Sequence, residues 1–300
     1  MKTVLITGCS TGFGRLAAEE LAARGHRVFA TMRDPEGKNR KPAMALADQA
    51  RTHGWKLDVL ELDVTSDASV AAAREAVLAQ SDGPDVVINN AGQMFTGITE
   101  AFTPAEMARQ LDVNVVGIHR VCRTFLPAMR ARGQGLIINV SSIAGRMAVP
   151  FFGLYHASKW AVEGYSLALR HELACTGIDV VVVEPGPFTT ELFVQSPQPV
   201  DLEQRAGTYP PVAHETLQGM AASFEALFED ADAPTGPEAV VDCFVSLVES
   251  PERPRPFRHV VGLDFGVRER NAADAVFDPP LLEAMQLAEF TRLKAAQPAL

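Results

Sequence analysis

The stretch Thr7-Gly8-Cys9-Ser10-Thr11-Gly12-Phe13-Gly14 decides the fold that we expect for this chain. The apolar run Thr3–Thr7 predicts a buried strand before it, and Phe13–Arg24 predicts a helix after it that ends at Gly25. Glycines let a backbone turn tightly and approach a phosphate, and a helix N-terminus offers free N–H groups to an anion. The loop therefore predicts a dinucleotide-binding site, in which Ser10 and Thr11 add hydroxyl donors. An ordinary glycine-rich turn is the alternative, because the spacing is not GxGxxG.

The same alternation of a short apolar run and a helical pattern continues along the chain. Further strands are expected at Val28–Met32, Leu57–Leu62, Val86–Ile88, Leu136–Val140, Asp179–Val183 and Arg258–Gly262. Apolar strands that are separated by helices indicate a parallel sheet covered on both faces. We therefore predict an α/β fold in one domain: a Rossmann-type, doubly wound parallel sheet of about seven strands.

Several helices can be placed from the same pattern. One is capped near Thr65 or Ser66, and one covers Leu154–Cys175. A long helix is expected from about Pro104 to Arg132, with a bend at Pro127 because proline cannot donate the backbone hydrogen bond.

Two regions break the rhythm. The segment Pro185–Pro237 is rich in Pro, Thr and Gln and suits a mobile cover over a site. The tail beyond Gly262 contains one helical pattern, Pro280–Lys294. We expect a domain over residues 1–265 with a substrate lid at about 187–237, followed by a C-terminal extension over 266–300.

Composition limits the classes of partner. The 300 residues include 37 acidic and 27 basic side chains, and this net charge of -10 disfavours nucleic acid or an anionic membrane as the main partner. The four scattered cysteines (Cys9, Cys122, Cys175 and Cys243) indicate reduced thiols, and no His/Asp/Glu/Cys cluster has metal-ligand spacing. Neither a signal-peptide pattern nor a run of about 20 apolar residues occurs. The expectation is a soluble, cytoplasmic protein without a metal.

The end of the second strand bears on the nucleotide. An acidic residue there accepts hydrogen bonds from a ribose 2′-hydroxyl, whereas an arginine suits a 2′-phosphate. Met32 stands where the acid is expected, and Arg33 follows it. This favours NADP(H) over NAD(H); a surface arginine neutralised by Asp34 is the alternative.

Three motifs in order resemble the short-chain dehydrogenase/reductase family. Thr7–Gly14 matches TGxxxGxG, Asn89-Asn90-Ala91-Gly92 matches NNAG, and Tyr155–Lys159 matches YxxxK. The resemblance implies a catalytic set of Asn114, Ser142, Tyr155 and Lys159. It implies cofactor contacts by Gly8, Ser10, Thr11, Gly12, Phe13, Gly14, Arg33, Asp63, Val64, Asn90, Ala91, Gly92, Tyr155, Lys159, Pro185, Gly186, Phe188 and Thr190. From spacing alone, Ser141 competes with Ser142 and Thr189 with Thr190.

The spacing of Tyr155 and Lys159 agrees with this chemistry. Residues four apart share one helix face. A nearby ammonium should lower the pKa of the phenol, which would then exchange a proton with a substrate oxygen, while Ser142 stabilises the developing charge. The resemblance further implies that Lys159 holds the nicotinamide ribose and that Asn114 supports a water chain. His156 should point away and is interpreted as structural.

The expected function is an NADP(H)-dependent oxidoreductase that acts on a carbonyl or secondary alcohol. Val28–Pro35 and Asn114–Lys159 are similar to hydroxysteroid and retinol dehydrogenases, which suggests a hydrophobic substrate. Six aromatic residues could line its pocket or belong to the core: Phe151, Phe152, Phe193, Tyr209, Phe224 and Phe228. The alternative is an NADP(H)-binding regulator with little turnover; an epimerase or dehydratase ranks below both. By analogy, a homodimer or homotetramer is expected.

Overall fold

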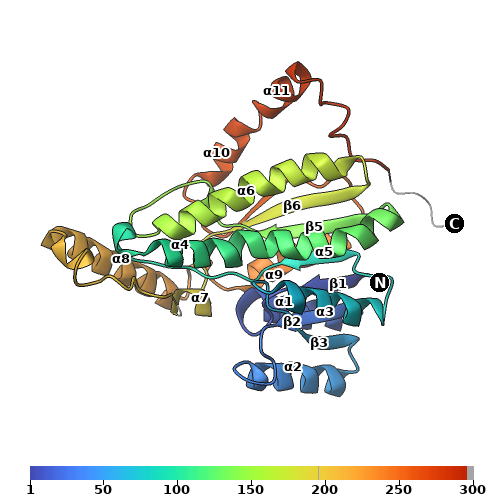
Figure 1. The fold of residues 1–300 in the computed structure, drawn as a ribbon, viewed down its shortest axis with the longest axis horizontal. Coiled ribbons are helices and arrows are strands. Elements are labelled where there is room, and N and C mark those ends of the chain that lie inside the picture. Colours follow the sequence, from blue (N-terminus) through green and yellow to red (C-terminus); the bar gives the residue numbers. More distant parts are fainter. Residues whose placement is uncertain (195, 296–300) are drawn as a thin grey trace.

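One parallel sheet organises the computed structural model, which describes residues 1–194 and 196–295. Its strands are β1 (Thr3–Ile6), β2 (Arg27–Met32), β3 (Leu57–Glu61), β4 (Val86–Asn89), β5 (Gly135–Val140), β6 (Ile178–Pro185) and β7 (Arg258–Val261). They lie in the order β3-β2-β1-β4-β5-β6-β7, and every neighbouring pair is parallel (Figure 1). The seven-stranded, doubly wound fold is confirmed. Its order reverses between β1 and β4, which is where such sheets bind ligands.

Helices connect the strands and cover the sheet. Those that join β1 to β7 are α1 (Gly12–Ala23), α2 (Arg40–His53), α3 (Asp67–Leu78), α4 (Pro104–Leu111), α5 (Gly117–Arg132), α6 (Gly153–Ala174), α7 (Glu191–Val194), α8 (Pro211–Glu229) and α9 (Glu238–Glu249). After β7 come α10 (Val267–Asp274) and α11 (Asp278–Ala284). The expected cap of the third helix is Ser66, whose side chain accepts a hydrogen bond from the Ser69 N–H.

The sheet separates two apolar cores. In β1, Val4 and Ile6 face a core shared with α1, α2 and α9, whereas Leu5 faces one shared with α3, α5 and α6. All three side chains are fully buried. This alternation explains why the strands are apolar without a break: a parallel sheet covered on both faces has no solvent side.

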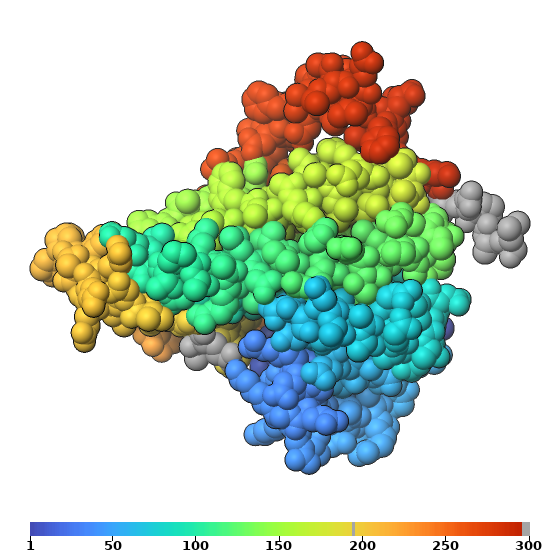
Figure 2. Space-filling model, viewed as in Figure 1, coloured from blue at the N-terminus to red at the C-terminus, as the bar shows by residue number. Residues whose placement is uncertain are grey.

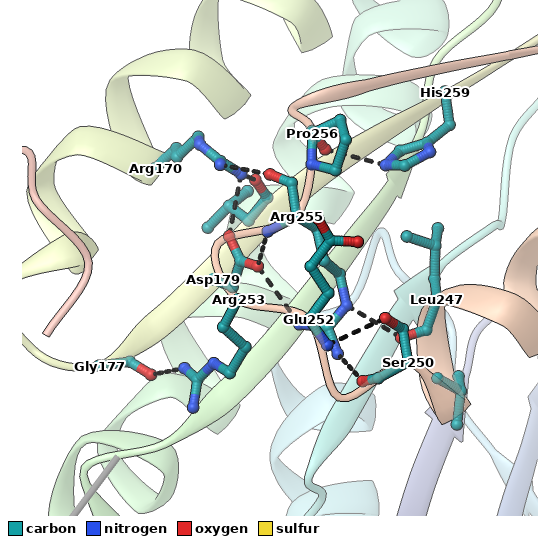
Figure 3. A network of polar contacts seen from close by, with 12 residues as sticks. Arg170, Gly177, Asp179, Leu247, Ser250, Glu252, Arg253, Arg255, Pro256 and His259 are labelled. Atoms are coloured by element: carbon teal, nitrogen blue, oxygen red, sulfur yellow. Dashed lines mark hydrogen bonds and ion pairs between the residues drawn. The ribbon is translucent and has the colours of Figure 1, made fainter. Parts of the chain in front are cut away.

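A buried ionic network fastens the β7 edge to the sheet. The Asp179 carboxylate accepts hydrogen bonds from Arg170 (2.9 Å) and Arg255 (3.3 Å) and from the Arg255 backbone N–H (3.0 Å). Arg255 also donates to the carbonyls of Leu247 and Ser250 (Figure 3). These contacts join the start of β6 to the segment between α9 and β7.

The structure corrects the helix expected from Pro104 to Arg132. It is divided into α4 and α5 by a π-helical turn, Asp112–Val116, so the irregularity lies upstream of Pro127, which sits inside α5. A π-helical turn occurs mostly as a single turn inside an α-helix, so the helical pattern on its two sides does not mark it.

The segments outside the sheet also differ from expectation. The lid segment contains a 19-residue helix, α8, which projects to one side of the molecule (Figure 2). The helix expected over Pro280–Lys294 is wrong, because α11 begins at Asp278 and ends at Ala284. Gln286 then adopts a left-handed backbone conformation (φ 59°), which terminates a helix. Gln195 of the expected lid and residues 296–300 of the expected extension lie outside the described residues.

Candidate active site

A cleft of about 680 Å³ opens at the carboxyl ends of the strands. Most of the residues expected at the site line it: Gly8, Ser10, Thr11, Gly12, Phe13, Arg33, Asp63, Val64, Asn90, Ala91, Gly92, Ser142, Tyr155, Lys159, Pro185, Phe188 and Thr190. Gly14, Asn114 and Gly186 are outside the lining. The topology therefore gathers residues from six different strand ends, and from the segment that follows β6, into one cavity.

The glycine loop packs against the segment that follows β4. Thr7 Oγ1 accepts hydrogen bonds from the N–H groups of Asn90 and Ala91, both at 3.0 Å, and Asn90 Nδ2 donates to the Thr7 carbonyl at 2.9 Å. A Cβ on Gly14 would lie 2.5 Å from the Gly8 carbonyl oxygen. Gly14 is thus required because the start of α1 packs closely on the Gly8 backbone, at a position that does not line the cleft.

The backbone N–H groups that could bind an anion lie where the glycine loop enters α1. The Thr11 side chain forms no hydrogen bond to the first turn of α1, so the N–H groups there face the cleft without a side-chain cap. Gly12 has a left-handed conformation (φ 57°), and a Cβ on it would only reach ordinary contact with Thr190 at 3.8 Å. This end of the cleft fits a pyrophosphate.

Arg33 lies exposed at the cleft edge. Asp34 does not pair with it: the Asp34 carboxylate accepts a hydrogen bond from the Lys38 N–H at 2.7 Å within a tight turn. The same turn places Lys38 and Asn39 on the cleft, and Asn39 Nδ2 donates to the Arg33 carbonyl at 2.7 Å. The sequence analysis missed Lys38, although its position shortly after Arg33 was a usable signal.

Tyr155 and Lys159 lie together at the centre of the cleft, both buried. Lys159 Nζ is 5.6 Å from the Tyr155 ring centroid and donates to the Val140 carbonyl at 2.8 Å. Burial lowers the pKa of Lys159 to about 8, a shift that Glu163 opposes. The prediction that Tyr155 and Lys159 lie on the same face of the helix is confirmed.

The expected lowering of the Tyr155 pKa is wrong in this structure. Burial raises the pKa of Tyr155 to about 12, and the hydrogen bond with Ser142 offsets this only in part. Desolvation of the phenol outweighs neighbouring polar groups because a phenolate loses more hydration than a neutral phenol. The Tyr155 phenol therefore keeps its proton at neutral pH in this structure.

The two adjacent serines face different surroundings. Ser142 lies against Tyr155; its Oγ accepts a hydrogen bond from the Ala144 N–H at 3.1 Å and donates to the Pro185 carbonyl at 3.3 Å. Ser141 Oγ is buried without a hydrogen-bond partner, beside Gly145. Both serines line the cleft, but the hydrogen bond with Tyr155 is made by Ser142, the residue that the family resemblance implies.

Asn114 occupies the π-helical turn behind the cleft. Its Nδ2 donates to the Gln93 carbonyl (2.9 Å) and to Ser158 Oγ (3.0 Å), and its Oδ1 accepts from the Gln93 N–H (2.9 Å). Asn114 thus joins the segment after β4 to the helix that carries Tyr155. A water chain through this residue stays a prediction.

The segment after β6 contributes three of the expected residues. Phe188 is buried and packs edge-on against Phe13, with ring centroids 5.6 Å apart. Thr190 lines the cleft, whereas Thr189 is exposed and its N–H donates to the Thr235 carbonyl. Gly186 packs against the Leu263 backbone, so its place is structural.

The outer part of the cleft is apolar. Met94, Phe152 and Tyr155 form a cluster with Leu192, Phe193, Met220 and Phe224 from the lid. Of the six aromatic residues considered above, Phe152, Phe193 and Phe224 belong to this cluster, and Phe228 packs on Phe193. Phe151 and Tyr209 pack elsewhere, against Ile98 and Ala206.

His156 uses both ring nitrogens in local structure. Nδ1 pairs with the Ala144 carbonyl at 2.8 Å, and Nε2 accepts from the Val149 N–H at 2.9 Å. The structural interpretation of His156 is confirmed. Within residues 1–194 and 196–295, no group of three His, Cys, Asp or Glu side chains could hold a metal ion, and no helix combines the length and apolarity needed to cross a membrane.

The sequence matches the family model of the short chain dehydrogenases over residues 2–200. Among curated proteins it is 36% identical to 3-ketodihydrosphingosine reductase of Bacteroides thetaiotaomicron, over 69% of this chain and 78% of that protein. It is 37% identical to human 17-beta-hydroxysteroid dehydrogenase type 1, over 83% and 74% of the two chains. The corresponding values for human retinol dehydrogenase 8 are 34% identity, 84% and 79%.

Solved structures agree with this relationship. A short-chain dehydrogenase from Streptomyces avermitilis superposes with a TM-score of 0.74 at 28% identity, covering 95% of this chain and 98% of its own. An actinorhodin polyketide ketoreductase with NADPH superposes with a TM-score of 0.71 at 26% identity, covering 89% and 97%.

Proposed function

This chain belongs to the short chain dehydrogenase family of enzymes, and on that premise we propose that it is an NADPH-dependent reductase of hydrophobic carbonyl compounds. One observation carries the proposal: Tyr155, Lys159, Ser142 and the glycine loop line a single cleft whose outer part is apolar. The proton donor, the nucleotide cradle and a hydrophobic wall therefore meet at one place.

The cleft fits a dinucleotide with a 2′-phosphate. The N–H groups at the start of α1 would hold the pyrophosphate, and Arg33 with Lys38 would hold the 2′-phosphate, since Asp34 is engaged in its own turn. Asp63 and Val64 would contact the adenine, and Asn90, Ala91 and Gly92 would border the cofactor. Lys159 would hold the nicotinamide ribose, beside Phe188 and Thr190. Bound NADPH would supply a hydride to a carbonyl carbon.

The protonated state of Tyr155 fits a proton donor for the reductive direction. A phenol with a pKa of about 12 keeps its proton at neutral pH and can give it to a carbonyl oxygen as that oxygen gains negative charge. The Ser142 hydroxyl, which now donates to the Pro185 carbonyl, would turn to donate a second hydrogen bond to the same substrate oxygen.

The apolar cluster supports a hydrophobic substrate. Leu192 and Phe193, from residues 187–237, which we propose as the substrate lid, line the cleft together with Met94. Met220 and Phe224 of the same segment pack with Phe152 in the cluster behind them. The names of the relatives point in the same direction, because they include a ketosphingoid reductase, a retinol dehydrogenase and a hydroxysteroid dehydrogenase.

The test is a screen of NADPH oxidation with steroid, retinoid, aliphatic ketone and quinone substrates, repeated with NADH. We expect turnover of at least one apolar carbonyl class and a preference for NADPH. Tight NADPH binding without turnover of any class would favour a regulator, and turnover with small polar ketones alone would contradict the substrate class.

A further inference from the structure

A second polar cluster lies behind the cleft, outside its lining. Glu163 of α6 and Glu184 of β6 are 3% and 0% exposed, and both contact Arg258 of β7. Glu163 follows Lys159 by one helical turn, and Glu184 directly precedes Pro185. The cluster therefore touches both the helix that carries the proton donor and the strand end that borders the cleft.

The carboxyl oxygens of this cluster are not all paired. Arg258 Nε is 3.0 Å from Glu163 Oε2 and 3.5 Å from Glu184 Oε1. Asn271 Nδ2 donates to Glu184 Oε2 at 2.6 Å. Glu163 Oε1 and Glu184 Oε1 are buried without a hydrogen-bond donor. Two ionised carboxylates could not donate to one another, so one proton between them would satisfy both oxygens.

The network at Asp179 provides a contrast in the same sheet. There a single carboxylate receives two guanidinium groups, Arg170 and Arg255, and all its hydrogen bonds come from donors (Figure 3). At Glu163 and Glu184 two carboxyl groups share one guanidinium. A buried like-charge pair is costly, and protonation of one member removes that cost.

We propose that Glu163 and Glu184 share one proton, which Glu184 carries and donates to Glu163 Oε1, and that this pair positions the strand end at Pro185 against the Lys159 helix. The shorter contact with Arg258 and the ammonium of Lys159 favour the negative charge on Glu163. Burial and the neighbouring Glu163 raise the pKa of Glu184 to about 8, well above its ordinary value of 4.5.

The pair also connects the C-terminal extension to the cleft. Asn271 of α10, which donates to Glu184, accepts a hydrogen bond from Arg146 Nε at 2.8 Å. Arg146 pairs in addition with Asp274 of α10 and lies just after Ser142 in the chain. The charged groups around the pair are thus Lys159, Arg258, Arg146 and Asp274, of which the last two pair with one another.

The proposal predicts a specific dependence of stability on pH. Because the pKa of Glu184 is raised on folding, its stabilising contribution is complete below pH 4.5 and is lost as the pH rises through about 8. Glu184→Gln keeps the donor to Glu163 and cannot ionise. We expect the wild-type Tm to fall more than that of Glu184→Gln between about pH 5 and pH 9. Glu172→Gln, on the exposed face of the same helix, is the control and should follow the wild type.

Infrared spectroscopy tests the shared proton directly. The wild-type spectrum at pH 7 should contain the C=O band of a buried protonated carboxyl, which disappears above about pH 8 and is absent in Glu184→Gln. A spectrum without that band, or a band retained in Glu184→Gln and lost in Glu163→Gln, would overturn the assignment to Glu184. Neither measurement needs a substrate or cofactor, so its outcome is independent of the proposed function.

Discussion

The two sides of the cleft are built in different ways. On the glycine-loop side, Thr7 Oγ1 accepts hydrogen bonds from the Asn90 and Ala91 N–H groups, and Asn90 Nδ2 donates to the Thr7 carbonyl, at 2.9–3.0 Å over a buried core. On the lid side, α8 projects from the molecule (Figures 1 and 2). It contains no buried residue and packs on the apolar cluster beside the cleft through half-buried side chains such as Met220 and Phe224.

This difference separates binding of the nucleotide from choice of the substrate. A loop held by short, buried hydrogen bonds tolerates few substitutions, whereas a helix held by a few half-buried apolar side chains can change its surface at small cost. We therefore expect substitutions on the glycine-loop side to abolish function and substitutions on the lid side to alter specificity.

The largest effect on NADPH affinity is expected from Gly14→Ala. Its Cβ would press on the Gly8 carbonyl oxygen at 2.5 Å, and such overpacking costs about 1–3 kcal/mol. NADPH affinity should fall by about a hundredfold, measured by fluorescence titration. Gly219→Ala on α8 is the matched control, because no atom lies within 4 Å of its Cβ. An equal loss in both variants would remove the contrast between the two sides.

Arg33→Asp should have the next largest effect. The change places a carboxylate where the 2′-phosphate is expected and removes a charge-assisted contact of about 1.5–3 kcal/mol. NADPH affinity should fall by about tenfold or more while NADH affinity changes little. Lys38→Ala should produce a smaller loss of the same kind. Equal losses for both nucleotides would contradict the 2′-phosphate role.

A pH titration tests Lys159 on the same side. Since the pKa of Lys159 is lowered to about 8, its positive charge is lost as the pH rises through that value. NADPH affinity should therefore fall by several-fold above about pH 8. Lys159→Arg keeps its charge and should flatten this fall, whereas Glu184→Gln should retain it. An identical fall in Lys159→Arg would assign the titration to another group.

The smallest effect, a rise in KM, is expected from Phe224→Ala in the proposed lid. Phe224→Ala removes a ring that packs on Phe152 and Phe193, with centroids 6.2 and 5.2 Å away. The KM of a bulky apolar ketone should rise about three- to tenfold, and NADPH affinity should stay unchanged. A loss of NADPH affinity as large as that of Gly14→Ala would show that the lid and the loop act as one unit.

Much of the sheet was predictable because its signals are local. Each of the seven strands lies at an expected position, and the glycine loop stands between the first strand and the first helix. The π-helical turn at Asp112–Val116 was not predictable, because it lies inside one continuous helical pattern. The end of α11 was not predictable either, because its left-handed residue is Gln286 and not the usual glycine. The helix α8 was missed because its sequence, with Gly219 at its centre, has few buried positions.

The sequence predicted which residues line the candidate site better than it predicted their pKa values. The motifs brought Tyr155, Lys159 and Ser142 to one cleft, yet spacing alone contains no information on burial, which reverses the expected direction of the Tyr155 pKa. Glu184 escaped notice for the same reason: its contacts with Glu163 and Asn271 join β6 to elements 21 residues before it and 87 residues after it.

The most direct test of the proposed function compares wild type with Tyr155→Phe at saturating NADPH. Phenylalanine keeps the ring and its packing against Met94 and Phe152 but cannot donate a proton. The rate of carbonyl reduction should fall by about 10²- to 10⁴-fold, with NADPH affinity unchanged. Reduction by Tyr155→Phe at the wild-type rate would contradict the role of Tyr155 as the proton donor.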